Sequence, residues 1–218
     1  MPPTTVVFDM DGVLLDSGHA WNEVLQELFR ACDRPWSALD QQAFAGGDNS
    51  RQWASYLRRM HALPWSDGEI VRWVTDRILE RFRVSLPLLP GAEAAVARLG
   101  ARYQLGLASS SPREIIAYVL RASGMEPYFA AWVSSDDVVC GKPAPDVYLH
   151  ICALLGTAPD TAVAVEDSPM GVASAKAAGL RVIAIPQVWF PLTGDELATA
   201  DLVLSSLAEL QPGTVAAL

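Results

Sequence analysis

From about residue 90 onward, short apolar runs alternate with segments of helical periodicity, and this alternation constrains the fold more than any other feature of the chain. Apolar runs bounded by turn residues are typical of buried strands, and the segments between them are long enough for helices. Strands that alternate with helices form right-handed crossovers, which give a parallel sheet covered on both faces. We therefore predict an α/β fold with a doubly wound parallel sheet of six strands, near residues 6–8, 103–108, 131–134, 162–165, 181–185 and 202–204.

The intervening helices carry recognisable end signals. Ser111 is predicted to cap a helix that Pro112 opens, with Glu114 completing a capping box. Glycines close the helices, which we expect at about residues 92–99, 112–123, 145–155 and 169–178.

One stretch interrupts the alternation, because residues 17–86 show helical patterns only. A helix is predicted from Asp16 or Ser17, a second from about Ser50, and a third after the capping box of Ser66 and Glu69. Five of the seven tryptophans lie in this stretch, and most are explained by a small core of its own. We expect a discontinuous core domain, residues 1–16 and 87–218, and a helical cap domain, residues 17–86, that covers one edge of the sheet. The two connections, at residues 16–17 and 85–90, are hinge candidates.

Composition narrows the class of protein. The formal net charge of −9 argues against nucleic acid or an anionic membrane as a partner. Residues 17–86 hold nine Arg and nine acidic residues, whereas the remainder holds seven basic and 16 acidic residues, so the acid surplus lies in the predicted core. No apolar run approaches a membrane span, and no basic and apolar leader begins the chain. We expect a cytoplasmic protein with three free cysteines, monomeric, with a dimer as the alternative.

Two carboxylates follow directly on the first predicted strand, where Asp9 and Asp11 flank Met10 ahead of Gly12. Ligands of open α/β sheets bind at the carboxyl ends of the strands, so acids there are candidates for metal ligation, nucleophilic attack or proton transfer. Taken alone, the same residues favour a simple turn, in which one carboxylate bonds its own backbone.

Polar residues also follow three later strands. Ser109 and Ser110 provide hydroxyl and backbone N–H groups just before a helix, which is an arrangement that binds anions. Lys142 is one of only two lysines and stands between a glycine and a proline at a helix entrance. Glu166 and Asp167 would repel each other unless a cation lay between them. Caps and solvated surface charges are the structural alternatives for each of these residues.

The order and placement of these residues resemble the haloacid dehalogenase (HAD) superfamily of phosphotransferases, in the subgroup with a helical cap between the first two motifs. The family pattern is an Asp-x-Asp after the first strand, a Ser or Thr after the second core strand, a Lys before a helix, and an acidic pair after a later strand. In this chain the corresponding residues are Asp9, Asp11, Ser109, Lys142, Glu166 and Asp167.

The resemblance implies a Rossmann-like core and a role for each of these residues. Asp9 would attack phosphorus and form an aspartyl-phosphate, and Asp11 would act as general acid and then general base. Ser109, Ser110 and Lys142 would hold the transferring group. Mg²⁺ would be bound by Asp9, the backbone carbonyl of Asp11, and Asp167, with Glu166 binding directly or through water.

Several members of the superfamily can be weighed against the sequence. Asp11 argues against a hydrolytic dehalogenase, and the absence of lysine from residues 17–86 argues against a phosphonoacetaldehyde hydrolase. A β-phosphoglucomutase-like enzyme remains an alternative, although this chain has Trp21 where those enzymes carry a histidine and lacks their cap lysine. A non-catalytic binding protein is a remote alternative, because no motif residue is lost.

The interpretation we favour is a phosphatase of small phosphate monoesters, similar to the phosphoglycolate and sugar-phosphate phosphatases. Arg51 could meet a second anionic group of the substrate, or it could be a surface residue at the start of a helix. The sequence does not identify the ester.

Overall fold

The computed structural model describes residues 1–37, 40, 48–187 and 192–218. Six parallel strands form one sheet in the order β3-β2-β1-β4-β5-β6. The first strand therefore lies inside the sheet, and the later strands are added first on one side of it and then on the other. The strands are β1 (Thr5–Phe8), β2 (Gln104–Ser109), β3 (Phe129–Ser134), β4 (Ala162–Glu166), β5 (Arg181–Ala184) and β6 (Leu202–Val203). The predicted α/β class and doubly wound sheet are confirmed.

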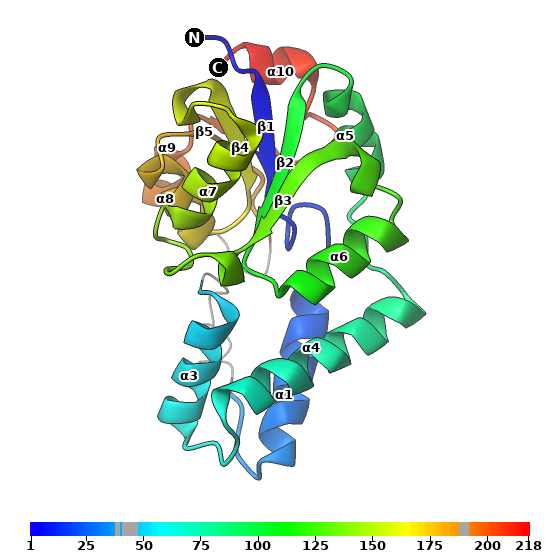
Figure 1. The fold of residues 1–218 in the computed structure, drawn as a ribbon, viewed down its shortest axis with the longest axis vertical. Helices are drawn as coiled ribbons and strands as arrows, with labels where there is room; N and C mark the ends of the chain where they lie inside the picture. The colour runs from blue at the N-terminus through cyan, green and yellow to red at the C-terminus, as the bar shows by residue number, and fades with distance from the viewer. Residues whose placement is uncertain (38–39, 41–47, 188–191) are drawn as a thin grey trace.

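Helices cover both faces of the sheet, as Figure 1 shows. The period of two along β1 decides which side chain joins which layer, since Val6 and Phe8 face one hydrophobic cluster and Val7 faces the other. The first layer contains α5 (Ala92–Gly100), α6 (Arg113–Ala122) and α10 (Pro212–Ala216), and the second contains α7 (Asp146–Leu155), α8 (Pro169–Ala177) and α9 (Gly194–Thr199).

Among the described residues, three further helices pack on one another beyond the carboxyl ends of the strands, as the lower half of Figure 1 shows. They are α1 (Gly18–Ala31), α3 (Ser50–His61) and α4 (Asp67–Val84), and we refer to them as the cap helices. Their inner faces are apolar at helical spacing, and the buried residues Val24, Leu28 and Ile78 belong to the hydrophobic cluster that continues into the sheet. The capping box of Ser66 and Glu69 is present as predicted.

The two connections between sheet and cap helices run side by side. Leu15 pairs with Leu88 in an antiparallel bridge, and the backbone N–H of Asp16 donates to the carbonyl of Pro87 at 2.8 Å. The domain boundaries at residues 16/17 and 86/87 stay a prediction. The sequence also predicts a short segment that ends at Gly46 and Gly47, and these two glycines lie outside the described residues.

None of the helices in the described part of the chain is both long and apolar enough to cross a bilayer. Cys32 and Cys152 are buried, Cys140 is exposed, and all three are free thiols.

Candidate functional site

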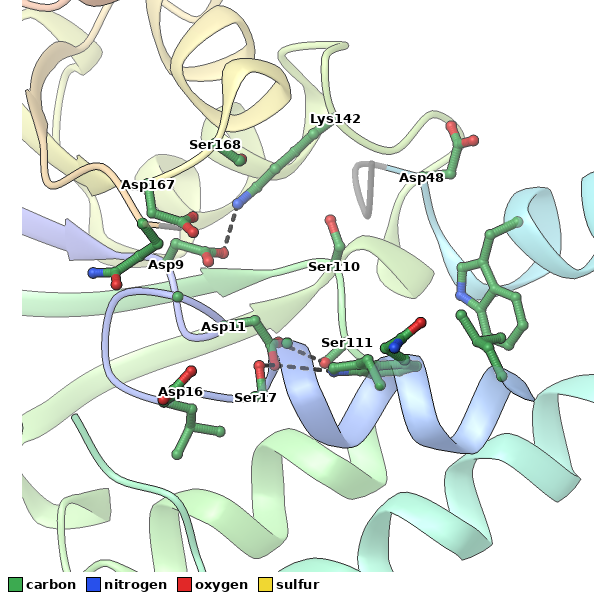
Figure 2. A pocket seen from close by; sticks show the side chains of 18 of the residues that line it. Asp9, Asp11, Asp16, Ser17, Asp48, Ser110, Ser111, Lys142, Asp167 and Ser168 are labelled. Atoms are coloured by element: carbon green, nitrogen blue, oxygen red, sulfur yellow. Dashed lines mark hydrogen bonds and ion pairs between the residues drawn. The ribbon is translucent and has the colours of Figure 1, made fainter. Parts of the chain in front are cut away.

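The first strand ends in the two acids of the predicted motif. The backbone N–H of Asp9 still pairs with the carbonyl of Val165, so Asp9 prolongs β1 by one residue before the chain turns. The side chain of Met10 points into the core, whereas Asp9 and Asp11 both line the pocket between the sheet and the cap helices, shown in Figure 2. Gly12 has a φ of 79°, and a Cβ there would overlap the carboxylate of Asp167, so only glycine fits this turn.

A cluster of three buried acids lies at the centre of the site. Asp9, Glu166 and Asp167 each offer a carboxylate oxygen within 4.8 Å of the others, and none of the three is more than 6% exposed. Glu166 ends β4 and Asp167 follows it, so the adjacency of β1 and β4 in the sheet brings the acids together.

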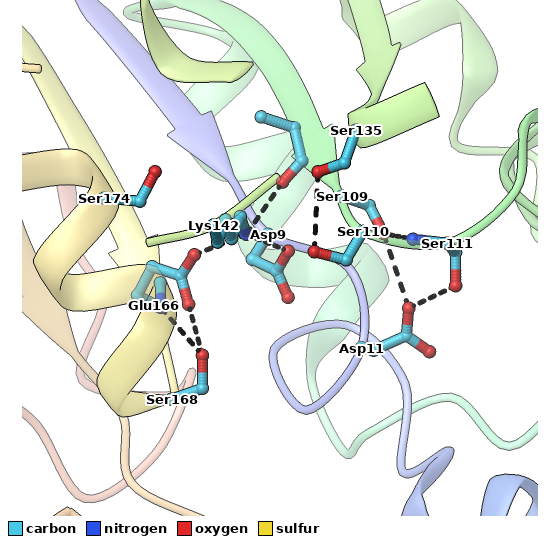
Figure 3. Close-up of polar contacts among 12 residues, drawn as sticks. Asp9, Asp11, Ser109, Ser110, Ser111, Ser135, Lys142, Glu166, Ser168 and Ser174 are labelled. Carbon is cyan, nitrogen blue, oxygen red and sulfur yellow. Dashed lines mark hydrogen bonds and ion pairs between the residues drawn. The ribbon is translucent and has the colours of Figure 1, made fainter. Parts of the chain in front are cut away.

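Lys142 is the cation of this cluster. Its Nζ donates to Asp9 Oδ1 at 2.7 Å, to Glu166 Oε1 at 2.6 Å and to the carbonyl of Ala108 at 3.2 Å, contacts drawn in Figure 3. These acceptors use all three N–H bonds of the ammonium. Lys142 therefore fixes the nucleophile candidate Asp9 to the metal-ligand candidate Glu166.

The charges of the cluster do not balance. Burial, opposed by Lys142 and reinforced by Glu166 and Asp11, raises the pKa of Asp9 to about 8. Burial, with Asp9 and Glu166 adding to it, also raises the pKa of Asp167 well above its usual value. Burial alone would lower the pKa of Lys142, but Asp9 and Glu166 raise it instead. Burial is thus the main cause of the shifts at Asp9 and Asp167, and the neighbouring carboxylates add to it. Three buried carboxylates beside one lysine are oxygen ligands in an arrangement that fits a hard metal cation.

Glu166 is also bonded by a residue of the second helix layer, which contains α7, α8 and α9. The hydroxyl of Tyr148, on α7, donates to Glu166 Oε1 at 2.5 Å, and its ring lies 5.2 Å from Lys142 Nζ. Gly171 packs against the same carboxylate so closely that a Cβ would overlap it. Tyr148 was not predicted as a site residue, because a tyrosine on the inner face of a helix carries no sequence signal that distinguishes this bond from ordinary packing.

Asp11 is held between the sheet and the cap helices. Its Oδ1 accepts from Ser17 Oγ at 2.6 Å and from Trp21 Nε1 at 3.2 Å, at the start of α1. Its Oδ2 accepts from Ser111 Oγ at 2.7 Å and from Ser109 Oγ at 3.4 Å, at the end of β2. One oxygen of this carboxylate is therefore bonded to the start of α1, and the other to the serines at the end of β2.

The prediction that Ser111 caps the next helix is wrong. Helix α6 begins at Arg113 after Pro112 and has no side-chain cap, because the hydroxyl of Ser111 is directed to Asp11 instead. Ser110 and Ser111 line the pocket, whereas Ser109 is fully buried and its oxygen accepts from the backbone N–H of Ser111 at 3.0 Å.

The structure does not bring Arg51 to this pocket. Arg51 is the second residue of α3, is exposed, and lines a separate groove that also contains Asp67 and Glu114. His19, at the start of α1, is likewise exposed and lies 3.0 Å from Glu23.

The cap side of the pocket is formed by aromatic, aliphatic and uncharged polar side chains, apart from one acid. They are Trp21, Asn22 and Leu25 on α1, Trp36 after it, and Asp48 and Trp53 at α3. Burial raises the pKa of Asp48.

The start of α3 docks on the loop that precedes Lys142. The backbone N–H of Ser50 donates to Asp136 Oδ1 at 2.7 Å, and Gln52 Oε1 accepts from the backbone N–H of Gly141 at 3.0 Å. Asn49 caps α3 and donates its side-chain amide to the carbonyl of Val139 at 3.3 Å. The acid Asp136 thus completes the N-terminus of a cap helix.

A parallel sheet that presents two aspartates, a buried lysine and an acidic pair at one edge defines the class of this protein. Residues 3–179 match the family model of the haloacid dehalogenase-like hydrolases, and the chain belongs to this family.

Its relatives include named phosphatases. Hexitol phosphatase B of Escherichia coli (strain K12) is 34% identical, with 94% of this chain and 92% of that protein covered. The phosphorylated carbohydrates phosphatase of Thermotoga maritima is 32% identical, with 82% of each chain covered. The crystal structure of CbbY from Rhodobacter sphaeroides in complex with phosphate superposes with a TM-score of 0.88 at 27% identity, over the full length of both chains. The chain is accordingly a phosphoric monoester hydrolase, as predicted.

Proposed function

We propose that the chain hydrolyses small phosphate monoesters in two steps, through an aspartyl-phosphate on Asp9. The observation that carries this proposal is the bond from Lys142 to Asp9 Oδ1, which fixes a buried carboxylate at the floor of the pocket. A carboxylate oxygen of Asp9 forms the new bond to phosphorus while the ester oxygen leaves. Water then releases phosphate and restores Asp9.

We assign proton transfer to Asp11. Its carboxyl group would protonate the leaving oxygen in the first step and deprotonate the attacking water in the second. Donors from Ser17, Trp21 and Ser111 orient this carboxylate at the pocket wall, which supports the assignment. Ser110, which lines the pocket, and Ser109 would assist in holding the phosphoryl group.

We propose Mg²⁺ as the ion of the acid cluster. Asp9, Asp167 and the backbone carbonyl of Asp11 would hold it, with Glu166 binding directly or through water, and the oxygen-only donor set suits this cation. When bound, the ion supplies positive charge that balances the phosphoryl oxygens. The surplus of buried negative charge around Asp9 supports a divalent cation at this place.

For the substrate we propose a phosphorylated carbohydrate, because the named relatives are a hexitol phosphatase and a phosphatase of phosphorylated carbohydrates. A phosphoglycolate-like ester was the other half of the sequence prediction, and its carboxylate has no partner in Arg51, which lines a different groove. A mutase is less well supported: Trp21 donates an indole N–H to Asp11 where a mutase carries a histidine, and an indole does not exchange protons near neutral pH. The monomeric state stays a prediction.

The nucleophile assignment is tested with Asp9→Asn. We expect Mg²⁺-dependent release of phosphate from p-nitrophenyl phosphate to fall to background, because an amide does not attack phosphorus. Asp16→Asn is the matched control, since Asp16 is an exposed acid of the same pocket, and it should keep most of the activity. Retained turnover in Asp9→Asn would show that the nucleophile lies elsewhere.

A further inference from the structure

The pocket has a phosphoryl end, at Asp9 and Lys142, and a cap end, at the cap helices, and charged residues are distributed differently at the two ends. The charged residues among those that line it are one lysine and five acids: Lys142, Asp9, Asp11, Asp16, Asp48 and Asp167. Lys142 already donates to Asp9, Glu166 and a backbone carbonyl. The ranges outside the description, residues 38–39, 41–47 and 188–191, contain no Lys, Arg or His in the sequence. No cation therefore faces the cap end of the pocket from the described lining residues, and these ranges hold none to add.

Aromatic rings line the cap end. Trp21 and Trp53 meet edge to face with ring centroids 6.4 Å apart, and Trp36 packs on Phe29 at 4.7 Å. The indole N–H of Trp36 donates to Asn22 Oδ1 at 3.1 Å, which fixes the ring beside the pocket. Flat rings of this kind offer contact area to C–H groups of a ligand and no positive charge.

Uncharged polar groups complete the lining. Asn22 from the cap helices and Gln187 after β5 both line the pocket and provide amide partners. Such groups bind hydroxyls, which both donate and accept.

We propose that the enzyme selects esters whose leaving group is uncharged and polyhydroxylated, and rejects esters that carry a second anionic group. This inference rests on the proposed phosphatase function and specifies its substrate class. At the phosphoryl end, Lys142 and the proposed Mg²⁺ would supply the positive charge that faces the transferring phosphoryl group. At the cap end a second phosphate or a carboxylate would meet Asp48 and the tryptophans without a counter-ion, which costs free energy in a partly buried site.

Two pairs of esters test this directly. Glycerol 3-phosphate and 3-phosphoglycerate share a three-carbon skeleton and differ in one carboxylate, and fructose 6-phosphate and fructose 1,6-bisphosphate differ in one phosphate. We expect kcat/KM, measured by release of phosphate with Mg²⁺ present, to be at least about tenfold higher for the first member of each pair. Equal or higher values for the anionic members would overturn the inference and leave the phosphatase function intact. Absence of Mg²⁺-dependent release from every ester, p-nitrophenyl phosphate included, would overturn both.

Variants at the cap end separate two causes of substrate selection, which are repulsion of anions by Asp48 and contact with the aromatic ring of Trp36. Asp48→Asn should raise kcat/KM for 3-phosphoglycerate by about threefold relative to glycerol 3-phosphate, because one repulsive charge is removed. Trp36→Ala should raise KM for fructose 6-phosphate about fivefold, and Trp36→Phe should restore most of the loss by keeping an aromatic face. Trp73→Ala is the matched control, since Trp73 is a half-buried cap tryptophan outside the pocket, and it should leave KM unchanged. An unchanged ratio in Asp48→Asn together with an unchanged KM in Trp36→Ala would overturn the inference.

Discussion

The sheet side of the pocket holds its side chains by short hydrogen bonds between segments far apart in the sequence, whereas the cap side holds its side chains mainly by packing. Lys142 and Glu166 are at most 2% exposed and bonded to each other, while Trp21 and Trp36 are half-buried rings that rest on other rings. A bonded, buried group has one position, and its loss leaves an uncompensated charge. A packed ring can be replaced by another of similar shape. The sheet side is therefore suited to a fixed chemical step, and the cap side to a choice of substrate that can change without disturbing that step.

Asp11 provides the most severe test of this comparison, because it is the one acid that both sides hold. We expect Asp11→Asn to lower kcat for an alkyl phosphate by about 100- to 1000-fold, since general acid catalysis of the leaving group is lost. With p-nitrophenyl phosphate the loss should be smaller, because that leaving group needs less help from a proton. Steady-state kinetics on both esters measures the difference, and equal losses would show that Asp11 has a structural role only.

The stability of the folded protein should depend on pH because of the buried carboxyl group of Asp9 on the sheet side of the pocket. The pKa of Asp9 is raised from 3.8 to about 8, so the folded state binds this proton more tightly than the unfolded state does. The resulting stability is fully present below about pH 4, falls as the unfolded carboxyl ionises, and is lost once pH passes about 8. We expect Tm of protein treated with EDTA to fall from pH 5 to pH 8.5, and Mg²⁺ to raise Tm more at pH 8.5 than at pH 5.

Scanning calorimetry at the two pH values, with and without Mg²⁺, measures this dependence. Glu166→Gln removes one of the charges that raise the pKa of Asp9, so it should flatten the slope. A Tm that rises with pH in the presence of EDTA would contradict the charge assignment of the cluster.

The smallest expected effect concerns the docking of α3. Asp136→Ala removes the acceptor for the backbone N–H of Ser50 and weakens the closed arrangement of cap and sheet. We expect KM to rise about two- to threefold with kcat nearly unchanged, because the pocket closes less often around the substrate. Asp160→Ala, an exposed acid just before β4, is the control. A fall in kcat without a change in KM would place Asp136 in the chemistry instead.

The sheet and the motif residues were predictable because each depends on local pattern. A run such as Val6 to Phe8 followed by an acid carries its strand and its turn in consecutive residues, and parallel strands present their carboxyl ends at one edge. Asp9, Lys142, Glu166 and Asp167 are brought together as this reasoning predicts.

The sequence did not predict contacts between segments that lie far apart in the chain. Local pattern explains the residues that make these contacts equally well in another way. Ser111 before a proline satisfies the pattern of a helix cap, yet its hydroxyl turns to Asp11, 100 residues away. Trp21 fits the apolar stripe of α1, and only the packing of α1 on the sheet aims its N–H at the same acid. For Arg51 the sequence leaves two alternatives open, and only the packing of α3 decides between them, because it leaves Arg51 exposed in a separate groove.

The two glycines that lie against the acids, Gly12 beside Asp167 and Gly171 beside Glu166, have a consequence for the entropy of binding. A carboxylate pressed against bare backbone retains few rotamers, so its conformational entropy is lost when the chain folds rather than when a cation or a substrate arrives. Association then needs to order less of the protein, and more of the contact energy remains as affinity. The absence of a side chain at Gly12 and at Gly171 therefore favours binding, although neither glycine needs to contact the ligand.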